Sequence, residues 1–557
     1  MGKKPRLTYL ALAVIALVTL IGSACAGPAG TTTGTGNTPQ VLRLNLAGEP
    51  NLIDPSRMSW TNEATVIKQV FVGMFSFNAD LTLKSVVAKE IPTVANKGIS
   101  ADGKTYTFNL NPNVTWSDGK KVTAKDFEYS IKRMLSPEIA SDYASFYFAI
   151  AGAEAYNAAT DKDAATKEQL KSAVGVKAVN DTTLQITLAY QSPTFLQLMA
   201  LPQSFPLRED VIAANGEKWT EPPNYIGNGP FVLTEWVHQD HITLKPNSNY
   251  WGAKPKLSEI QLKMITDINA SLAAYKNNEL DMTTVQPGTE KTIMADPVLS
   301  KEIVRFNDLA TYGLTFNLAV PPFDNVKVRQ AITTAIDRDT FIDKIRNGVG
   351  KPATSWIPPG MPGYNANLGS QYKFDKAKAK QLLSDAGYSD VSKLPPIKFQ
   401  YADSAGNKTI AQFLQAQMKD NLGIDLILEP METKAFQAAY NAKQYSMKWG
   451  GWIADYPDPE NWLPELYGTK GGNNKQNYSS KQFDDLAAQA KVELDNSKRL
   501  QLWDQAQQIV VDDAPFAFIN YRERFQVRKP WVKGMVTTAM DASLIGDFFW
   551  DQIYIQK

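Results

Sequence analysis

Three sets of residues in this 557-residue chain have types that could carry chemistry. Cys25 is the single cysteine, His238 and His241 are the only histidines, and Asp455 stands in the Gly- and Trp-rich segment 450–459. A single cysteine excludes an intramolecular disulfide, a paired-cysteine metal site and an iron–sulfur cluster. Two histidines three positions apart between strand patterns are typical of a solvated hairpin loop, because borderline metals need more convergent ligands. We therefore expect no metal and no cofactor.

Enzymatic chemistry is not indicated either. The sequence has no GxSxG elbow, HExxH helix, phosphate-binding loop or activated cysteine.

The charges of the chain are nearly balanced: Lys and Arg number 58 and Asp and Glu 57, without long runs of one sign. Because binding to phosphates needs clustered cations, nucleic acid is not an expected partner. With 43% hydrophobic residues, the chain can bury a large core.

The amino terminus has the pattern of a targeting signal. Basic residues at positions 3–6 precede an apolar run over 7–21, which is short for a membrane-spanning helix. Cys25 follows three small residues and resembles the acylated cysteine of bacterial lipoproteins, although Gly22 stands where that motif usually has Leu. The alternative is an ordinary signal peptide with an incidental cysteine. Residues 26–40, rich in Gly, Thr and Pro, are predicted to form a flexible tether.

Beyond the tether, strand and helix patterns are mixed throughout, which indicates an α/β protein. In the helix predicted over 124–134, Thr123 is the expected N-cap and Asp126 lies in the first turn. Gly423 is expected to end a helix. Further helices are predicted over 326–336, 377–386 and 410–422, with two more within 483–511. Strands are predicted over 41–46, 105–110, 184–188, 397–401 and 424–428, with a hairpin-like pair at 231–233 and 242–244.

Ordered sequence blocks run through most of residues 41–557. They are Glu49-Pro-Asn-Leu-Ile-Asp-Pro55, Asp102-Gly-Lys-Thr-Tyr-Thr-Phe108, Trp116-Ser-Asp-Gly119, Val122-Thr-Ala-Lys-Asp-Phe127, Gly227-Asn-Gly-Pro-Phe231, Tyr250-Trp251, Pro322-Phe323-Asp324 and Gly451-Trp-Ile-Ala-Asp-Tyr-Pro-Asp-Pro459. In this order they resemble the extracellular solute-binding proteins of peptide ABC importers, the oligopeptide- and dipeptide-binding family 5.

The resemblance implies an α/β, two-lobed, hinged fold like that of periplasmic binding proteins, with an additional smaller domain. The ligand would be enclosed between the lobes. The expected parts are a signal peptide (1–24), a lipidated cysteine and tether (25–40), lobe I (41–75, 195–310 and 524–557), the extra domain (76–194) and lobe II (311–523).

The same resemblance assigns Asp455 to the positively charged amino terminus of a peptide, because a carboxylate pairs with an ammonium through charge-assisted hydrogen bonds. Without the resemblance, Asp455 would be a surface turn residue, since Asp-Tyr-Pro-Asp-Pro is turn chemistry. Gly451 lets the backbone approach a ligand closely, so this strand is expected to pair with an extended peptide. Trp449 and Trp452 are expected as cavity walls, with a place in the core as the alternative.

Other site residues follow from the same block and from the first signature loop. Ala454 and Tyr456 flank the aspartate and complete the predicted site. In peptide receptors of the family, an arginine at the position of Trp449 would engage the ligand carboxylate, and Lys448 could replace it here. Glu49 and Asn51 are candidates for the opposite wall, with a structural turn as the alternative.

We therefore expect a monomeric substrate-binding lipoprotein outside the cytoplasm. It would be anchored to the cell membrane and deliver short peptides to the permease subunits of an ABC importer. An oligosaccharide or another small solute is the alternative ligand, because the scaffold serves several solutes and aromatic residues also suit sugar stacking.

Overall fold

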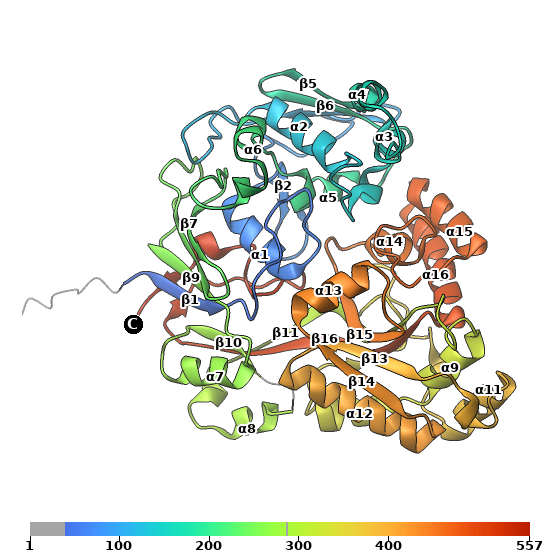
Figure 1. Ribbon diagram of the computed structural model, residues 1–557. Helices are drawn as coiled ribbons and strands as arrows, with labels where there is room; N and C mark the ends of the chain where they lie inside the picture. Colours follow the sequence, from blue (N-terminus) through green and yellow to red (C-terminus); the bar gives the residue numbers. More distant parts are fainter. Residues whose placement is uncertain (1–38, 286–287) are drawn as a thin grey trace, which may run out of the picture. The chain divides into compact units, whose positions relative to one another are not determined.

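The computed structural model describes residues 39–285 and 288–557 (Figure 1). The predicted signal peptide, Cys25 and nearly all of the tether lie outside the described residues. Among the helices of the described part, none is long and apolar enough to cross a membrane. Residues 39–557 form one unit by their contacts, and the fold is that of this unit.

One four-stranded sheet joins segments that lie far apart in the chain. Its strands are, in order across the sheet, β1 (Val41–Asn45), β9 (Glu259–Lys263), β8 (His241–Pro246) and β7 (Phe231–Val237). The alternating residues Leu42 and Leu44 of β1 are fully buried, as a strand with one face on the core requires. The predicted first strand and the predicted hairpin pair are both confirmed. The two histidines lie at the β7–β8 turn.

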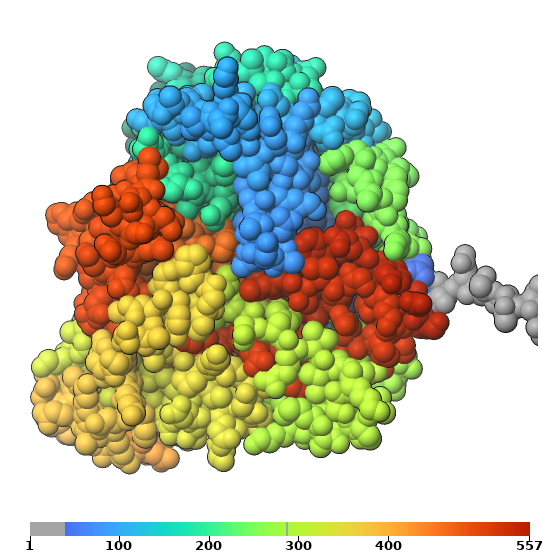
Figure 2. Space-filling model, turned by 180° about the vertical axis from the view of Figure 1, so that it is seen from behind, coloured from blue at the N-terminus to red at the C-terminus, as the bar shows by residue number. Residues whose placement is uncertain are grey.

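The carboxyl-terminal segment packs against this amino-terminal region. Gln40 donates its side-chain amide to the backbone oxygen of Ile555 at 2.8 Å. Lys68, on helix α1 (Thr61–Val70), forms an ion pair of 2.7 Å with Asp547. Figure 2 shows the carboxyl-terminal residues, in red, beside blue amino-terminal ones. Together with the four-stranded sheet, which joins β1 to β7–β9, these contacts bring together the three segments predicted for lobe I. The exact boundaries of lobe I stay a prediction.

Within residues 76–194 lies a separate three-stranded sheet, visible at the top of Figure 1. It consists of β4 (Thr105–Asn109), β6 (Thr183–Thr187) and β5 (Val176–Asn180), and the associated helices are α2 (Ala124–Met134), α3 (Ala153–Asn157) and α4 (Ala164–Ala173). Helix α2 has the predicted bounds. The side chain of Asp126 accepts a hydrogen bond from the backbone of Thr123 at 2.7 Å, which is half of a capping box.

The largest sheet has seven strands. They are β10 (Met282–Thr284), β16 (Phe516–Arg528), β11 (Ile303–Phe316), β15 (Met447–Ile453), β13 (Ile397–Ala402) and β14 (Leu426–Met431) in order, with β12 (Lys351–Pro352) on β16. The predicted lobe boundaries near 310 and 523 fall inside β11 and β16, where Asn307 pairs with Glu523. The two strands therefore run together past the point at which the chain is predicted to cross between lobes.

Helices cover both sides of this sheet. Figure 1 shows α12 (Ala405–Leu422) on one side and α13 (Thr433–Asn441) on the side towards α1. Gly423 ends α12 with a positive φ of 80°, which confirms the predicted cap. The strand predicted over 424–428 begins two residues later, at Leu426, because the chain needs those residues to turn after the cap. The other predicted helices correspond to α9 (Val326–Thr334), α11 (Lys376–Asp385), α15 (Lys481–Val492) and α16 (Asn496–Asp513).

Candidate functional site

A cavity of about 380 Å³, here called the central cavity, lies beside strand β15. Its size falls within the range that small ligands occupy in proteins, about 300–1,000 Å³. Three of the predicted parts of the chain line it. The lining residues are Ser59, Trp60 and Thr61, then Tyr143 of the extra domain, and Tyr312, Ala402, Asn407, Phe436, Tyr440, Asn441, Lys448–Ile453, Asp455 and Asn473 of the predicted lobe II.

Two further hollows adjoin the central cavity and share lining residues with it. An inner pocket of about 70 Å³ shares Tyr143 and Asp455 and is otherwise mostly apolar. An outer cavity of about 730 Å³ shares Trp60 and Phe436. Asp455 therefore lies where the central cavity meets the inner pocket.

Asp455 lies two residues beyond Ile453, where β15 ends, and is held there by neighbouring polar groups. Asn461 donates its side-chain amide to the Asp455 carboxylate at 2.9 Å and accepts the Asp455 backbone N–H at 2.9 Å. The Tyr143 hydroxyl donates to the same carboxylate at 3.2 Å. Burial raises the pKa of Asp455 to about 6, although the hydrogen bonds from Asn461 and Tyr143 act in the opposite direction.

No cationic side chain of the described residues lies within 4 Å of the Asp455 carboxylate. Lys68, which lines the inner pocket, is paired with Asp547 instead and acts on Asp455 only at longer range. A carboxylate with neutral hydrogen-bond donors and no counter-ion, on the wall of a cavity, is suited to bind a cation that enters the cavity.

Lys448, at the other end of β15, carries the opposite charge. Its residue is only 6% exposed, and its ammonium lies 3.7 Å from the centre of the Tyr440 ring on α13. The Phe436 ring is 5.5 Å away. Burial lowers the pKa of Lys448 to about 7. The cavity thus has a carboxylate and an amine at separate points along one strand.

The residues between them form the cavity wall in different ways. Trp449 is buried and packs between Tyr312 and Phe341, at centroid distances of 6.1 Å each, so it belongs to the core as well as to the cavity lining. Trp452 is partly buried and donates its indole N–H to Asn461 at 3.2 Å. Asn461 therefore positions both the carboxylate and an aromatic wall.

Gly451 lies on the cavity and is exposed, as the predicted close approach to a ligand requires. A second reason for glycine appears at this position. A Cβ atom at residue 451 would lie 2.2 Å from the backbone oxygen of Thr311 on β11, so the strand pairing itself excludes a side chain.

The pairing of β15 with β13 that the structure describes covers only Met447 and Lys448. Beyond Lys448, the cavity side of β15 faces no described strand.

The other predicted site residues lie around this arrangement. Ala454 lines the inner pocket, and Tyr456 is fully buried against Phe146. Glu49 accepts hydrogen bonds from His238 at 2.5 Å and Lys434 at 3.4 Å, outside the described lining of the central cavity. Asn51 is exposed and also lies outside that lining. The assignment of Glu49 and Asn51 to the opposite wall stays a prediction.

From the amino-terminal part of the chain, the central cavity is lined by Ser59, Trp60 and Thr61, a few residues beyond the signature loop. The buried Glu63 side chain of α1 accepts the backbone N–H groups of Ser59 and Trp60, at 3.0 and 3.1 Å. Burial raises the pKa of Glu63 to about 7. Only the Glu63 half of a capping box is present, and because tryptophan has no side-chain acceptor, the sequence carries no clear helix-start signal here. Tyr143 has no local signal either, because it reaches the site from the predicted extra domain.

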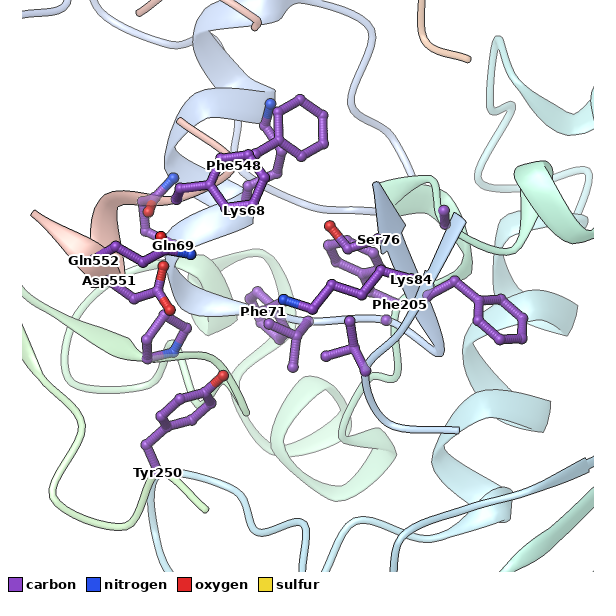
Figure 3. Close-up of a pocket in the computed structure, with 17 residues that line it drawn as sticks. Lys68, Gln69, Phe71, Ser76, Lys84, Phe205, Tyr250, Phe548, Asp551 and Gln552 are labelled. Atoms are coloured by element: carbon purple, nitrogen blue, oxygen red, sulfur yellow. The ribbon is translucent and has the colours of Figure 1, made fainter. Parts of the chain in front are cut away.

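A separate pocket of about 100 Å³ shares the lining residues Lys68, Ala200 and Phe548 with the inner pocket. Figure 3 shows the Lys84 amine and the Asp551 carboxylate pointing into it from different segments. Burial raises the pKa of Asp551, and Lys84 opposes that shift. Among the described residues, no group of three or more His, Cys, Asp or Glu side chains is arranged to hold a metal ion.

Comparisons with known proteins place this geometry in a family. Residues 89–474 match the sequence pattern of the bacterial extracellular solute-binding proteins, family 5, middle region. The oligopeptide-binding protein OppA of Bacillus subtilis is 34% identical over 534 residues, which covers 93% of this chain and 95% of that protein.

Solved structures agree with the sequence comparison. The murein tripeptide binding protein MppA of Escherichia coli aligns with a TM-score of 0.85 and 28% identity over 93% of this chain and 99% of that one. An unliganded open form of MppA aligns with a TM-score of 0.64 and 27% identity, over 93% and 97%. The predicted α/β two-lobed fold with a smaller extra domain is confirmed. Because the family pattern and a relative of 34% identity each cover most of the sequence, the chain belongs to the bacterial extracellular solute-binding proteins of family 5.

Proposed function

We propose that this protein captures short peptides in the central cavity and delivers them to the permease of an ABC importer. The relatives named above bind oligopeptides and a murein tripeptide. The observation that carries the proposal is the Asp455 carboxylate, which faces the cavity with hydrogen-bond donors but no cation of its own among the described residues. The free ammonium is the one cation that every unmodified peptide presents.

The open side of β15 supports a peptide over other solutes. The described ladder to β13 ends at Lys448, and the cavity is lined by the strand residues that follow. An extended peptide with its ammonium at Asp455 could continue the sheet there as an antiparallel strand, with main-chain hydrogen bonds that do not depend on its sequence. The aromatic rings of Trp452 and Trp60 would then contact its side chains.

Capture would proceed by closure of the lobes around the ligand. Contacts already join the expected parts: Tyr143 meets Asp455 on the cavity wall, and Lys434 meets Glu49 outside it. The unliganded open form of MppA fits this chain less well than the other MppA structure does, as expected if the lobes here are arranged more as in a closed receptor. Closure would be favoured only by as much as the ligand prefers the closed state.

The experiment is ligand identification followed by calorimetry. Native mass spectrometry of the purified protein should show bound peptides of mixed sequence. After the ligand has been removed by unfolding and refolding, trialanine should bind, and Asp455→Asn should weaken its binding at least tenfold. The matched control is Asp425→Asn, which changes an exposed aspartate paired with Lys419 and should have no effect. A released oligosaccharide, or an unchanged affinity in Asp455→Asn, would refute the peptide assignment.

We also propose that the mature protein begins at Cys25, is acylated there and is held to the outer face of the cell membrane as a monomer. The support is the position of the only cysteine directly after a signal-like segment. Two or more acyl chains give a lasting anchor, whereas one is marginal.

A further inference from the structure

We propose that the separate pocket of about 100 Å³ that Lys84 and Asp551 line, here called the Lys84 pocket, binds a small free α-amino acid such as alanine. The amino acid would place its carboxylate at Lys84 and its ammonium at Asp551. This ligand would be a second one, bound outside the central cavity. The inference goes beyond the proposed peptide function and does not depend on it. None of the residues described as lining the Lys84 pocket belongs to β15 or to the rest of the predicted lobe II.

Lys84 is positioned by a short hairpin. Strands β2 (Phe75–Phe77) and β3 (Leu83–Ser85) pair antiparallel, and Lys84 lies directly opposite Ser76. Side chains of directly opposite residues lie on the same face of an antiparallel pair, and both of these residues line the pocket (Figure 3). A lysine ammonium and a serine hydroxyl on one face can both donate hydrogen bonds to one carboxylate.

Asp551 faces the pocket from the carboxyl-terminal segment, within the short helix Trp550–Gln552. No cationic side chain in the described part of the chain lies within 4 Å of its carboxylate, and no described carboxylate lies within 4 Å of the Lys84 amine. Burial raises the pKa of Asp551, and the charge of Lys84 acts against that shift. The two groups are therefore within electrostatic reach of each other but are not paired.

The charges of the pocket favour a zwitterion over a simple ion. Of the residues described as lining it, Lys68, Lys84 and Asp551 are charged. Lys68 is already paired with Asp547 at 2.7 Å. A simple anion would satisfy only Lys84 and a simple cation only Asp551, whereas a molecule with both charges can pair with both residues.

The size of the pocket limits the ligand. A cavity of about 150 Å³ holds benzene, so about 100 Å³ fits roughly four to six heavy atoms, which suits glycine or alanine. The ammonium nitrogen and the carboxylate oxygens of an α-amino acid are about 3 Å apart. With about 2.8 Å for a charge-assisted hydrogen bond at each end, alanine can bridge groups up to about 9 Å apart. Its methyl group would contact aromatic walls, which include the rings of Phe71, Phe75, Phe205, Tyr250, Phe548 and Phe549.

One of these walls depends on a glycine. A Cβ atom at residue 73 would lie 2.5 Å from the Phe205 ring, and Gly73 does not have the positive φ that would itself require glycine. The absence of a side chain at this position therefore lets the Phe205 ring pack directly over the backbone. Gly73 and Phe205 both line the pocket, so an aromatic surface lies beside the hairpin that carries Lys84.

The test measures binding of L-alanine by calorimetry. The wild-type protein should bind L-alanine at least about tenfold more tightly than N-acetyl-alanine or alaninamide, because each analogue lacks one of the two charges. Lys84→Met and Asp551→Asn should each weaken alanine binding about tenfold or more, for the same reason. Phenylalanine should not compete with alanine, because its side chain exceeds the volume of the pocket.

Three controls separate the Lys84 pocket from the rest of the protein. Asp455→Asn should bind alanine within about twofold of the wild-type affinity, since Asp455 does not line this pocket. Lys419→Met is matched to Lys84→Met, because Lys419 is an exposed lysine paired with Asp425, and it should leave alanine binding unchanged. Lys84→Met and Asp551→Asn should bind trialanine as the wild type does, which would show that both variants are folded.

Three results would overturn the inference. They are no alanine binding at about 10 mM, equal alanine affinity in the wild type, Lys84→Met and Asp551→Asn, and loss of alanine binding in Asp455→Asn. The last result would place alanine in the central cavity. Failure of trialanine to bind the wild type would count against the peptide function alone, because alanine binding in the Lys84 pocket does not require it.

Discussion

Acidification should weaken peptide binding about tenfold between pH 7 and pH 5. The pKa of Asp455 in the free protein is raised to about 6 by burial. An ammonium bound to the carboxylate would lower that pKa, so the ligand must compete with a proton. The apparent dissociation constant then scales as 1 + 10^(pKa − pH), a factor of about 1.1 at pH 7 and about 11 at pH 5. Affinity is therefore close to its full value at pH 7, about half of it at pH 6, and is lost as the pH falls further.

The assay is a calorimetric titration in a series of buffers from pH 4.5 to 8.5. Below pH 6, trialanine binding should also release close to one proton, which shows as a dependence of the measured heat on the ionisation heat of the buffer. Burial also raises the pKa of Glu63 and of Glu465 to about 7, so these glutamates titrate in the same pH range. The control is Asp455→Asn, which removes the carboxyl group at position 455 and retains both glutamates. A flat affinity between pH 5 and 7, or an unchanged acid limb in Asp455→Asn, would refute the reasoning.

Three further substitutions test two contacts and the predicted lipid anchor. Tyr143→Phe removes a hydrogen bond that lowers the pKa of Asp455, so the acid limb of the affinity profile should move to higher pH, and an unmoved limb would contradict this role. Arg499→Met leaves the buried Asp458 carboxylate without its two-point partner at 2.8 and 2.5 Å, which should destabilise the fold by about 3–5 kcal/mol; a melting temperature within 1–2 °C of wild type would be the contrary result. Cys25→Ser should release the protein from membranes in cell fractionation, and its retention in the membrane fraction would contradict acylation at Cys25 as the anchor.

The sequence predicted those parts of the fold that depend on local pattern. Helix α2 and the cap at Gly423 were predictable because capping residues and apolar spacing act within one or two turns. The strand at Leu426 begins later than its apolar residues suggest, because the geometry after a left-handed cap is not visible in hydrophobic alternation. The assembly of lobe I from distant segments came from the family resemblance, since periodicity carries no information on which strands pair.

The candidate site was predictable only in part, for the same reason. Asp455, Trp452 and Gly451 belong to one sequence block, and the structure places all three on the central cavity. Tyr143, in the predicted extra domain, contacts Asp455 from 312 positions away along the chain. No linear spacing encodes such a contact, because the fold alone brings the two side chains together.

The raised pKa of Asp455 also bears on selection by the receptor. A shift from 3.8 to about 6 corresponds to roughly 3 kcal/mol by which the free site disfavours the charged carboxylate. A solute that brings a cation relieves this cost, whereas a neutral solute leaves the carboxylate unpaired or protonated. Tyr143 belongs to the predicted extra domain and Asp455 to the predicted lobe II, so pairing of the carboxylate bears directly on a contact between these parts. The same charge can therefore select the ligand and favour closure, since closure is stabilised only by interactions that the ligand makes better in the closed state.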